Sequence, residues 1–112
     1  MSSLAVRRLS VVMERTSIDA TSVARILERD PKTVSRWLRE QSSPRWEAKE
    51  KLLALDVVLE RLADVVPPEA AEDWLFTPVP SLDYERPADL IRAGEHRRVL
   101  ALIDAIGEGV FV

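Results

Sequence analysis

Basic and hydroxyl side chains are concentrated in residues 21–38, TSVARILERDPKTVSRWL. Arginine forms paired hydrogen bonds with guanine, and lysine, serine and threonine bind bases or phosphate oxygens, so this chemistry suits nucleic-acid recognition. Helical spacing turns four of these side chains outward, Lys32, Thr33, Ser35 and Arg36, together with Arg39 directly after the stretch. We expect Lys32, Thr33 and Arg36 to lie nearest the bases. Phosphates would meet Arg39, Arg45 and the helix start at Thr21. The alternative is a helical hairpin whose basic side chains are simply solvated.

Side chains suited to catalysis are scarce in this chain of 112 residues. It has no cysteine and a single histidine, His96, which excludes disulfides and thiolate zinc sites and leaves little for imidazole chemistry. The carboxylates Glu69, Glu72 and Asp73 follow Pro68, where they favour a helix dipole, and this structural role accounts for them. We therefore expect no enzyme, no metal and no cofactor, with His96 at the surface.

The last seven residues, IGEGVFV, are unusually apolar for the end of a chain. Gly107 and Gly109 permit backbone conformations that let the chain turn away after a helix. They are followed by Val110, Phe111 and Val112. Two interpretations remain open: the tail folds back onto its own core, or it binds the surface of another protein.

The candidate DNA contacts require two short helices joined by a tight turn. Val23, Ala24 and Leu27 form the inward face of a helix over about residues 19–27. Asp30-Pro31 is an N-cap followed by proline, and it begins a helix whose inward residues are Val34, Trp37 and Leu38. This pattern resembles Xre-like helix-turn-helix regulators. It departs from them at Glu28 and Arg29, where glycine and an apolar residue are usual.

Helical periodicity covers most of the remaining chain. A first helix is expected from Ser2 or Ser3 to about Arg15, and a fourth from Ser43-Pro44 to the prolines at 67–68, about 23 residues and about 34 Å long. Short helices follow over EAAEDWL, PADLIRAG closed by Gly94, and EHRRVLALIDAIG closed by Gly107. We predict an all-α fold, with a helix-turn-helix bundle and long linking helix in residues 1–67 and a small helical lobe in residues 68–112.

The expected fourth helix has two apolar faces. One consists of Ala48, Leu52, Leu55, Leu59, Leu62 and Val66, and the other of Leu53, Val57, Val58 and Val65. One face closes the N-terminal core. The other is covered either by the C-terminal lobe or by a second copy of the chain, because helix-turn-helix proteins usually bind paired half-sites as dimers.

Charge divides the chain into two unlike halves. Residues 1–50 hold ten Lys and Arg against seven Asp and Glu, whereas residues 51–112 hold six against twelve. This asymmetry indicates different partners for the two ends, with nucleic acid for the basic one. The N-terminal segment mixes arginines with apolar residues, so we expect no signal peptide, no membrane span and a cytoplasmic protein.

A family resemblance appears in residues 68–112. Trp74-Leu75 and a proline loop precede RPADLIRAGEHRRVLALIDAIGEGVFV. The features in that run are Pro87 before a short Leu90-Ile91 helix, Gly94-Glu95, Val99 and a final Gly109-Val110. In this order they resemble the C-terminal toxin-binding domain of the MbcA/ParS/Xre antitoxins, and a preceding helix-turn-helix is the usual companion of that domain.

The resemblance implies a bacterial type II antitoxin. Its partner would be a RES-domain toxin that degrades NAD, and toxin and antitoxin would sit together on their own promoter as a higher assembly. We expect the tail to block the NAD pocket, with Phe111 against apolar walls and the Val112 carboxylate on an arginine. Gly107, Gly109 and Val110 would position it.

Further toxin contacts are expected from Trp74, Arg92, Arg97 and Arg98, since tryptophan and arginine are favoured interface anchors. Core packing for Trp74 and a solvated helix face for the arginines are the alternatives. A rival interpretation of the whole chain is a stand-alone helix-turn-helix regulator whose C-terminal lobe binds a small ligand and whose tail is dispensable. A purely structural adaptor is a third.

Overall fold

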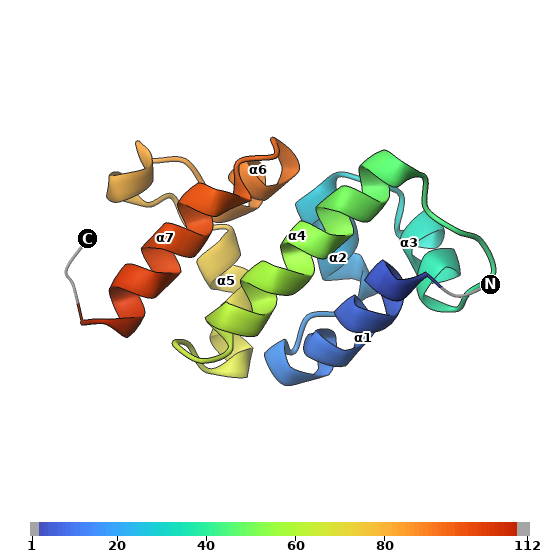
Figure 1. The fold of residues 1–112 in the computed structure, drawn as a ribbon, viewed down its shortest axis with the longest axis horizontal. Helices are drawn as coiled ribbons and strands as arrows, with labels where there is room; N and C mark the ends of the chain where they lie inside the picture. The colour runs from blue at the N-terminus through green and yellow to red at the C-terminus, as the bar shows by residue number, and fades with distance from the viewer. Residues whose placement is uncertain (1–2, 110–112) are drawn as a thin grey trace.

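Seven α-helices and two 3-10 turns make up the computed structural model, which describes residues 3–109 (Figure 1). The elements are α1 (Leu4–Thr16), α2 (Ala20–Leu27), α3 (Pro31–Leu38), α4 (Trp46–Leu62), η1 (Pro68–Ala70), α5 (Ala71–Leu75), η2 (Pro80–Leu82), α6 (Pro87–Arg92) and α7 (His96–Gly107). Extended pairing within residues 3–109 is limited to one bridge between Val79 and Glu85. The predicted all-α fold is confirmed. In the same part of the chain, no helix has the length and apolar character needed to cross a membrane.

Two aspartates begin the helices of the helix-turn-helix pattern. The Asp19 carboxylate accepts a hydrogen bond from the Ser22 backbone N–H at 2.9 Å, and the Asp30 carboxylate accepts one from the Lys32 N–H at 2.8 Å. Each bond satisfies a backbone donor that has no partner within the first turn of its helix. The starts predicted for α2 and α3 are therefore confirmed, including Pro31 as the first helical residue of α3.

Four helices end on a residue in the left-handed conformation: Ser17, Glu28, Glu40 and Gly94. In each case the next N–H returns to the carbonyl five residues earlier, as in Arg29 N to Ala24 O at 2.9 Å, which satisfies carbonyls left free at the helix end. Gly94 closes α6 as expected. Gly107 does not close α7, because it is the last helical residue, and the left-handed position falls on Gly109.

The fourth helix is shorter than its sequence predicts. It spans the 17 residues Trp46–Leu62 rather than about 23, with Pro44 and Arg45 in extended lead-in chain. Beyond Leu62 the backbone tightens into a turn in which the Val65 N–H bonds the Leu62 carbonyl. Pro67 disfavours the helical conformation at Val66, and two consecutive β-branched residues there have low helix propensity.

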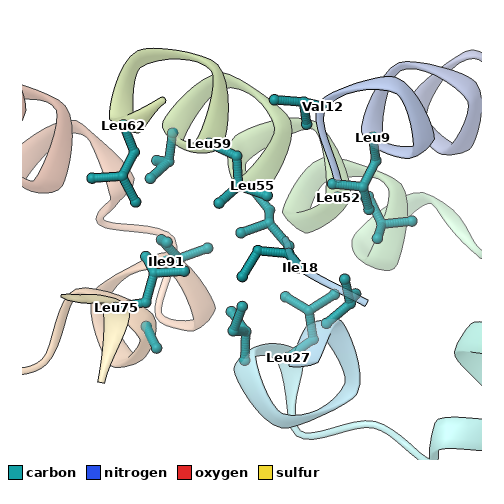
Figure 2. Packing of buried hydrophobic residues seen from close by; sticks show 14 of the residues in the cluster. Leu9, Val12, Ile18, Leu27, Leu52, Leu55, Leu59, Leu62, Leu75 and Ile91 are labelled. Atoms are coloured by element: carbon teal, nitrogen blue, oxygen red, sulfur yellow. The ribbon is translucent and has the colours of Figure 1, made fainter. Parts of the chain in front are cut away.

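One hydrophobic core runs through both halves of the chain, with α4 at its centre. Figure 2 shows Leu52, Leu55, Leu59 and Leu62 of α4 pointing toward Leu75 and Ile91 of the C-terminal segment and toward Leu9, Ile18 and Leu27 of the N-terminal one. Helix α4 packs mainly against α1, and also against α7 and α6. The packing is continuous across residue 67, so the division into two functional parts stays a prediction.

A buried carboxylate lies where α1 meets α4. The Asp56 side chain is fully buried, and Arg8 Nε lies 3.2 Å from its Oδ2, yet neither carboxylate oxygen has a hydrogen-bond partner among residues 3–109. Burial raises the pKa of Asp56, Glu60 raises it further, and Arg8 lowers it only in part. An ionised group in this position destabilises the fold, because its lost hydration is poorly replaced.

Replacing Asp56 with leucine should therefore stabilise the protein. Arg8 is 49% exposed, so its charge stays hydrated when the buried carboxylate is removed, and the free energy of unfolding should rise by about 1–4 kcal/mol, as it often does when apolar residues replace buried ion pairs. Because the folded pKa is raised, Asp56 lowers the free energy of unfolding least at pH values below its ordinary pKa of 3.8. It lowers that free energy most at pH values above its raised folded pKa. Thermal unfolding of Asp56→Leu should show a larger gain at neutral pH than near pH 3.8.

The contrasting variant is Arg8→Met, which removes the other partner. It leaves the buried carboxylate uncompensated and should lower the melting temperature at neutral pH. A stabilised Arg8→Met, or a destabilised Asp56→Leu, would contradict this account of the pair.

Candidate functional site

The outward face of α3 forms a basic hollow. Lys32, Ser35, Arg36 and Arg39 line it together with Pro31 and Gln41, and no carboxylate contributes to this lining. Lys32, Arg36 and Arg39 are exposed, whereas Val34 and Trp37 on the opposite face are buried. The structure thus brings together four of the seven predicted DNA contacts on one helix face, where their cationic groups are free to meet an anionic surface.

The remaining predicted DNA contacts lie beside this face. Thr33 is half-buried and lines a second hollow with the exposed Arg45 at the lead-in to α4. Arg29 lines the same hollow and adds a cation that was not among the predicted DNA contacts. Thr21 is exposed near the start of α2, outside both hollows.

The turn between α2 and α3 is built on Glu28, which adopts φ 52° and ψ 51°. This left-handed conformation is the one glycine takes at low cost, so the unusual sequence keeps the usual bend under some strain. Arg92 of α6 contacts this turn: its Nη1 donates to the Ile26 carbonyl at 2.8 Å, and its Nε lies 2.9 Å from the Glu28 carboxylate. A charged group from the C-terminal segment therefore holds the turn.

Asp89 fixes the direction of Arg92. It pairs with the Arg92 guanidinium and also accepts two hydrogen bonds from Arg86, at 2.8 and 2.9 Å. These bonds, with the Arg86 bonds as the largest cause, lower the pKa of Asp89, so it is ionised at neutral pH. Arg92 is consequently orientated from one side by Asp89 and bonded to the helix-turn-helix on the other.

A second link joins α5 to α2. The Ser22 hydroxyl donates to the Glu72 carboxylate at 2.7 Å, and Arg25 Nη1 lies 3.0 Å from the other Glu72 oxygen. The Arg25 guanidinium also lies over the Phe76 ring, 4.2 Å from its centre. Glu72, predicted only to favour its own helix dipole, thus connects the two parts of the chain.

The residues predicted to bind a partner are differently placed. Trp74 is half-buried and packs against the core, Arg97 is exposed, and Arg98 is half-buried with ion-pair distances of 3.4–3.5 Å to Asp83, Glu85 and Glu95. The guanidinium of Arg92 is already engaged within the chain. Gly107 and Gly109 are exposed at the end of α7, while Val110, Phe111 and Val112 lie outside the described residues.

An exposed tyrosine near α7 was not among the residues predicted to bind a partner. Tyr84 is 72% exposed and, like Asp83 before it, has a positive φ in the tight loop between η2 and α6. The loop is closed by the Tyr84 N–H to the Val79 carbonyl at 2.9 Å and anchored by the buried Leu82. Non-glycine residues in this conformation cluster at functional sites, and tyrosine is a favoured interface anchor. The one sequence signal for this tyrosine is its place in the proline-rich loop that precedes α6.

The basic face and the end of α7 lie at opposite ends of the molecule. The principal extents are 43 × 24 × 19 Å, and Figure 1 shows α3 near one end of the long axis and the C-terminal end of α7 at the other. Within residues 3–109, no group of three or more His, Cys, Asp and Glu residues is arranged to hold a metal ion. His96, expected at the surface, is half-buried at the start of α7.

Comparison with known proteins gives three related findings. The family model described as the antitoxin Xre/MbcA/ParS C-terminal toxin-binding domain matches residues 61–109. The mycobacterial cidal antitoxin MbcA of Mycobacterium tuberculosis is 42% identical over 104 residues, which cover 93% of this chain and 92% of that protein, and its counterpart in Mycobacterium bovis gives the same values. The crystal structure of the M. tuberculosis MbcT-MbcA toxin-antitoxin complex contains a chain that matches with a TM-score of 0.85 and 40% identity, covering 98% of this chain and 99% of that one.

Proposed function

This chain belongs to the Xre/MbcA/ParS antitoxin family, and we propose that it neutralises a RES-domain, NAD-degrading toxin in the cytoplasm and represses its own operon by binding DNA. The observation that carries the proposal is the likeness to MbcA over nearly the whole of both chains, including the solved antitoxin of a toxin-antitoxin complex. The protein acts as a binding partner and not as an enzyme.

Inhibition is assigned to the tail supported by the surrounding lobe. Gly107, at the end of α7, and Gly109 let the chain turn away, so that Val110, Phe111 and Val112 enter the NAD pocket of the toxin, where Phe111 meets apolar walls and the terminal carboxylate bonds a cationic group. Trp74, Arg97 and Arg98 lie on α5 and α7, and together with Tyr84 they supply surrounding contacts. The guanidinium of Arg92 is bonded within the chain, so Arg92 contributes to toxin binding only by holding α6 in place.

The test of this function is cellular NAD after induction of the neighbouring toxin gene. NAD should collapse when the toxin is expressed alone and remain at its normal level when this chain is expressed with it. Collapse in both cultures, with the two proteins present in equal amounts, would refute the antitoxin function.

DNA binding is assigned to α3 and the residues beside it. Lys32, Thr33 and Arg36 contact bases, while phosphates meet Arg39, Arg45 and the start of α2 at Thr21. Two features support this: the acid-free lining of the α3 hollow and the separation of this face from the end of α7. Because the two ends are far apart, a toxin bound at one leaves the other open to DNA, and toxin and antitoxin form a larger repressor together.

Arg36 and Arg39 should respond differently to replacement by alanine. Arg36→Ala should lose about 1–3 kcal/mol of discrimination at one base pair, because a bidentate contact is removed. Arg39→Ala should weaken binding to all sequences alike and reduce the salt slope by about one. Both are measured by titrating promoter fragments, original and base-substituted, at several salt concentrations. The control is Arg7→Ala, an exposed arginine on α1. An equal, sequence-independent loss for both variants would show that Arg36 touches only phosphate.

The rival function is a stand-alone regulator with a ligand in the C-terminal lobe. It is favoured by an open apolar groove of about 600 Å³ between α4 and the α6–α7 segment. A regulator of this kind would not protect NAD, and its promoter affinity would change with a small metabolite and not with the toxin.

A further inference from the structure

A second cationic hollow lies on α3, beside the one that carries Lys32 and Arg36. Two exposed arginines line it: Arg29 comes from the α2–α3 turn and Arg45 from the lead-in to α4. Neither guanidinium takes part in an ion pair or a side-chain hydrogen bond within residues 3–109. Two cations that share a hollow of about 260 Å³ without such a partner indicate an anionic ligand from outside the chain.

The other groups around this arginine-pair hollow narrow the class of anion. Thr33 is half-buried and Ser43 is exposed, and neither hydroxyl has a hydrogen-bond partner among the described residues. Hydroxyl and guanidinium groups are donors that proteins use for phosphate oxygens. Glu47 adds a carboxylate to the lining, so two arginines and one glutamate give a net charge of +1. A phosphodiester of the DNA backbone, with its single negative charge, matches this hollow better than a polyanion does.

The two hollows lie on different flanks of α3. Successive residues of an α-helix are rotated by about 100°, so Arg39 of the first hollow and Trp37 of the arginine-pair hollow point in directions about 160° apart. Arg36 and Thr33, which are assigned to bases, fall between these two directions. A helix in the major groove lies between two phosphate backbones, so its two flanks face different strands.

We propose that Arg29 and Arg45 together bind one phosphate of the DNA backbone, on the strand opposite the one that meets Arg39. Cations on both flanks then hold α3 between the two backbones and fix how the helix is rotated in the groove. The inference rests on the proposed DNA-binding function. It gives a role to Arg29, which stands where Xre-like helix-turn-helix regulators usually have an apolar residue.

The test is ethylation interference on a promoter fragment, in which single phosphates are blocked and the fragments that still bind are identified. The full chain is used, both alone and with its toxin. Arg29→Ala and Arg45→Ala should lose interference at the same phosphate of a half-site, whereas Arg39→Ala should lose it on the other strand. The matched control is Arg7→Ala, an exposed arginine on α1 outside both hollows, which should keep the whole pattern.

Affinity gives a second measurement on the same variants. Arg29→Ala and Arg45→Ala should each weaken binding about tenfold at low salt, equally for original and base-substituted fragments, because a charged hydrogen bond to phosphate is lost. The double variant should reduce the salt slope by about one and not by two, since a single phosphate is involved.

Glu47 allows a test in the opposite direction. Glu47→Gln removes a negative charge from the arginine-pair hollow, so it should tighten promoter binding about two- to fivefold at low salt. The matched control is Glu50→Gln, an exposed glutamate of α4 outside this hollow, which should change the affinity less.

The outcomes separate this contact from the DNA-binding function itself. A wild-type chain that binds no promoter DNA, alone or with toxin, would refute both. If the wild type binds and Arg29→Ala keeps its pattern and affinity, only the phosphate contact is overturned. The contact is also overturned if the Arg29 and Arg45 variants lose different phosphates, if their losses depend on base sequence, or if Glu47→Gln does not tighten binding.

Discussion

A chain that ends at Gly109 should fold normally and fail to neutralise its toxin. The packing within residues 3–109 makes a continuous core without the last three residues, so the melting temperature should be unchanged. Burial of Val110, Phe111 and Val112 in the toxin contributes about 1.5–3 kcal/mol for each side chain, so their loss should weaken binding about a thousandfold or more. The measurements are cellular NAD, toxin affinity by calorimetry and thermal unfolding of the free chain.

The position of this truncation matters. Ending the chain at Ile106 would also remove Gly107, the last residue of α7, whose position faces Val65. Ending it at Gly109 preserves the helix and separates loss of the tail from damage to the fold. The matched controls are Glu108→Ala, which removes an exposed charge and keeps the tail, and Phe111→Ala, which should be intermediate. Full protection by the shortened chain would move inhibition to the lobe, and a lowered melting temperature would show that the tail packs on its own core.

Capping residues and the spacing of apolar residues made most helices predictable from the sequence. Asp30 before Pro31 marks a helix start whatever surrounds it, and the apolar spacing of Val23, Leu27 and Val34 fixes which faces turn inward. The end of α4 was not predictable in the same way. The apolar pattern continues to Val66, although the helix stops at Leu62. A tightened turn keeps the side chains of Val65 and Val66 half-buried after the helix has ended, so the sequence pattern does not mark its end.

The contacts between distant segments could not be predicted from one sequence. Arg92 and Glu28 are separated by more than sixty residues, and each alone has the pattern of a solvated surface residue. The same holds for Glu72 and Ser22, where a dipole role explained the glutamate adequately. Long-range polar pairs of this kind depend on how the helices are arranged, and hydrophobic periodicity sets that arrangement only coarsely.

The apolar pattern of the sequence could not show which part of α4 stays exposed. Leu53 and Val58 both belong to the second apolar face predicted for this helix, yet Val58 is fully buried and Leu53 is not. The C-terminal segment covers only one side of that face. The two covers considered, a lobe and a second copy, therefore need not exclude each other.

Replacing Arg92 with alanine should impair the helix-turn-helix more than the toxin-binding end. Arg92 bonds the Ile26 carbonyl and the Glu28 carboxylate at the strained turn, and its side chain is only 21% exposed. Hydrogen bonds from a charged group contribute about 1.5–3 kcal/mol, and most of this should come from the Ile26 bond, because Glu28 is 69% exposed and screened by water. We expect a lower melting temperature and weaker promoter binding for Arg92→Ala, with protection of NAD retained.

Arg92→Lys separates this role from simple positive charge. A lysine keeps the charge but has one compact donor group, and it does not reach Ile26, Glu28 and Asp89 together as a planar guanidinium does. It should therefore rescue little of the lost stability or DNA affinity. Arg97→Ala, an exposed arginine of α7, is the control and should leave both unchanged. If Arg92→Ala instead binds promoter normally and no longer protects NAD, Arg92 is a toxin contact and its bonds to the turn are secondary. If lysine rescues fully, charge alone suffices, and the turn does not depend on the geometry of the guanidinium.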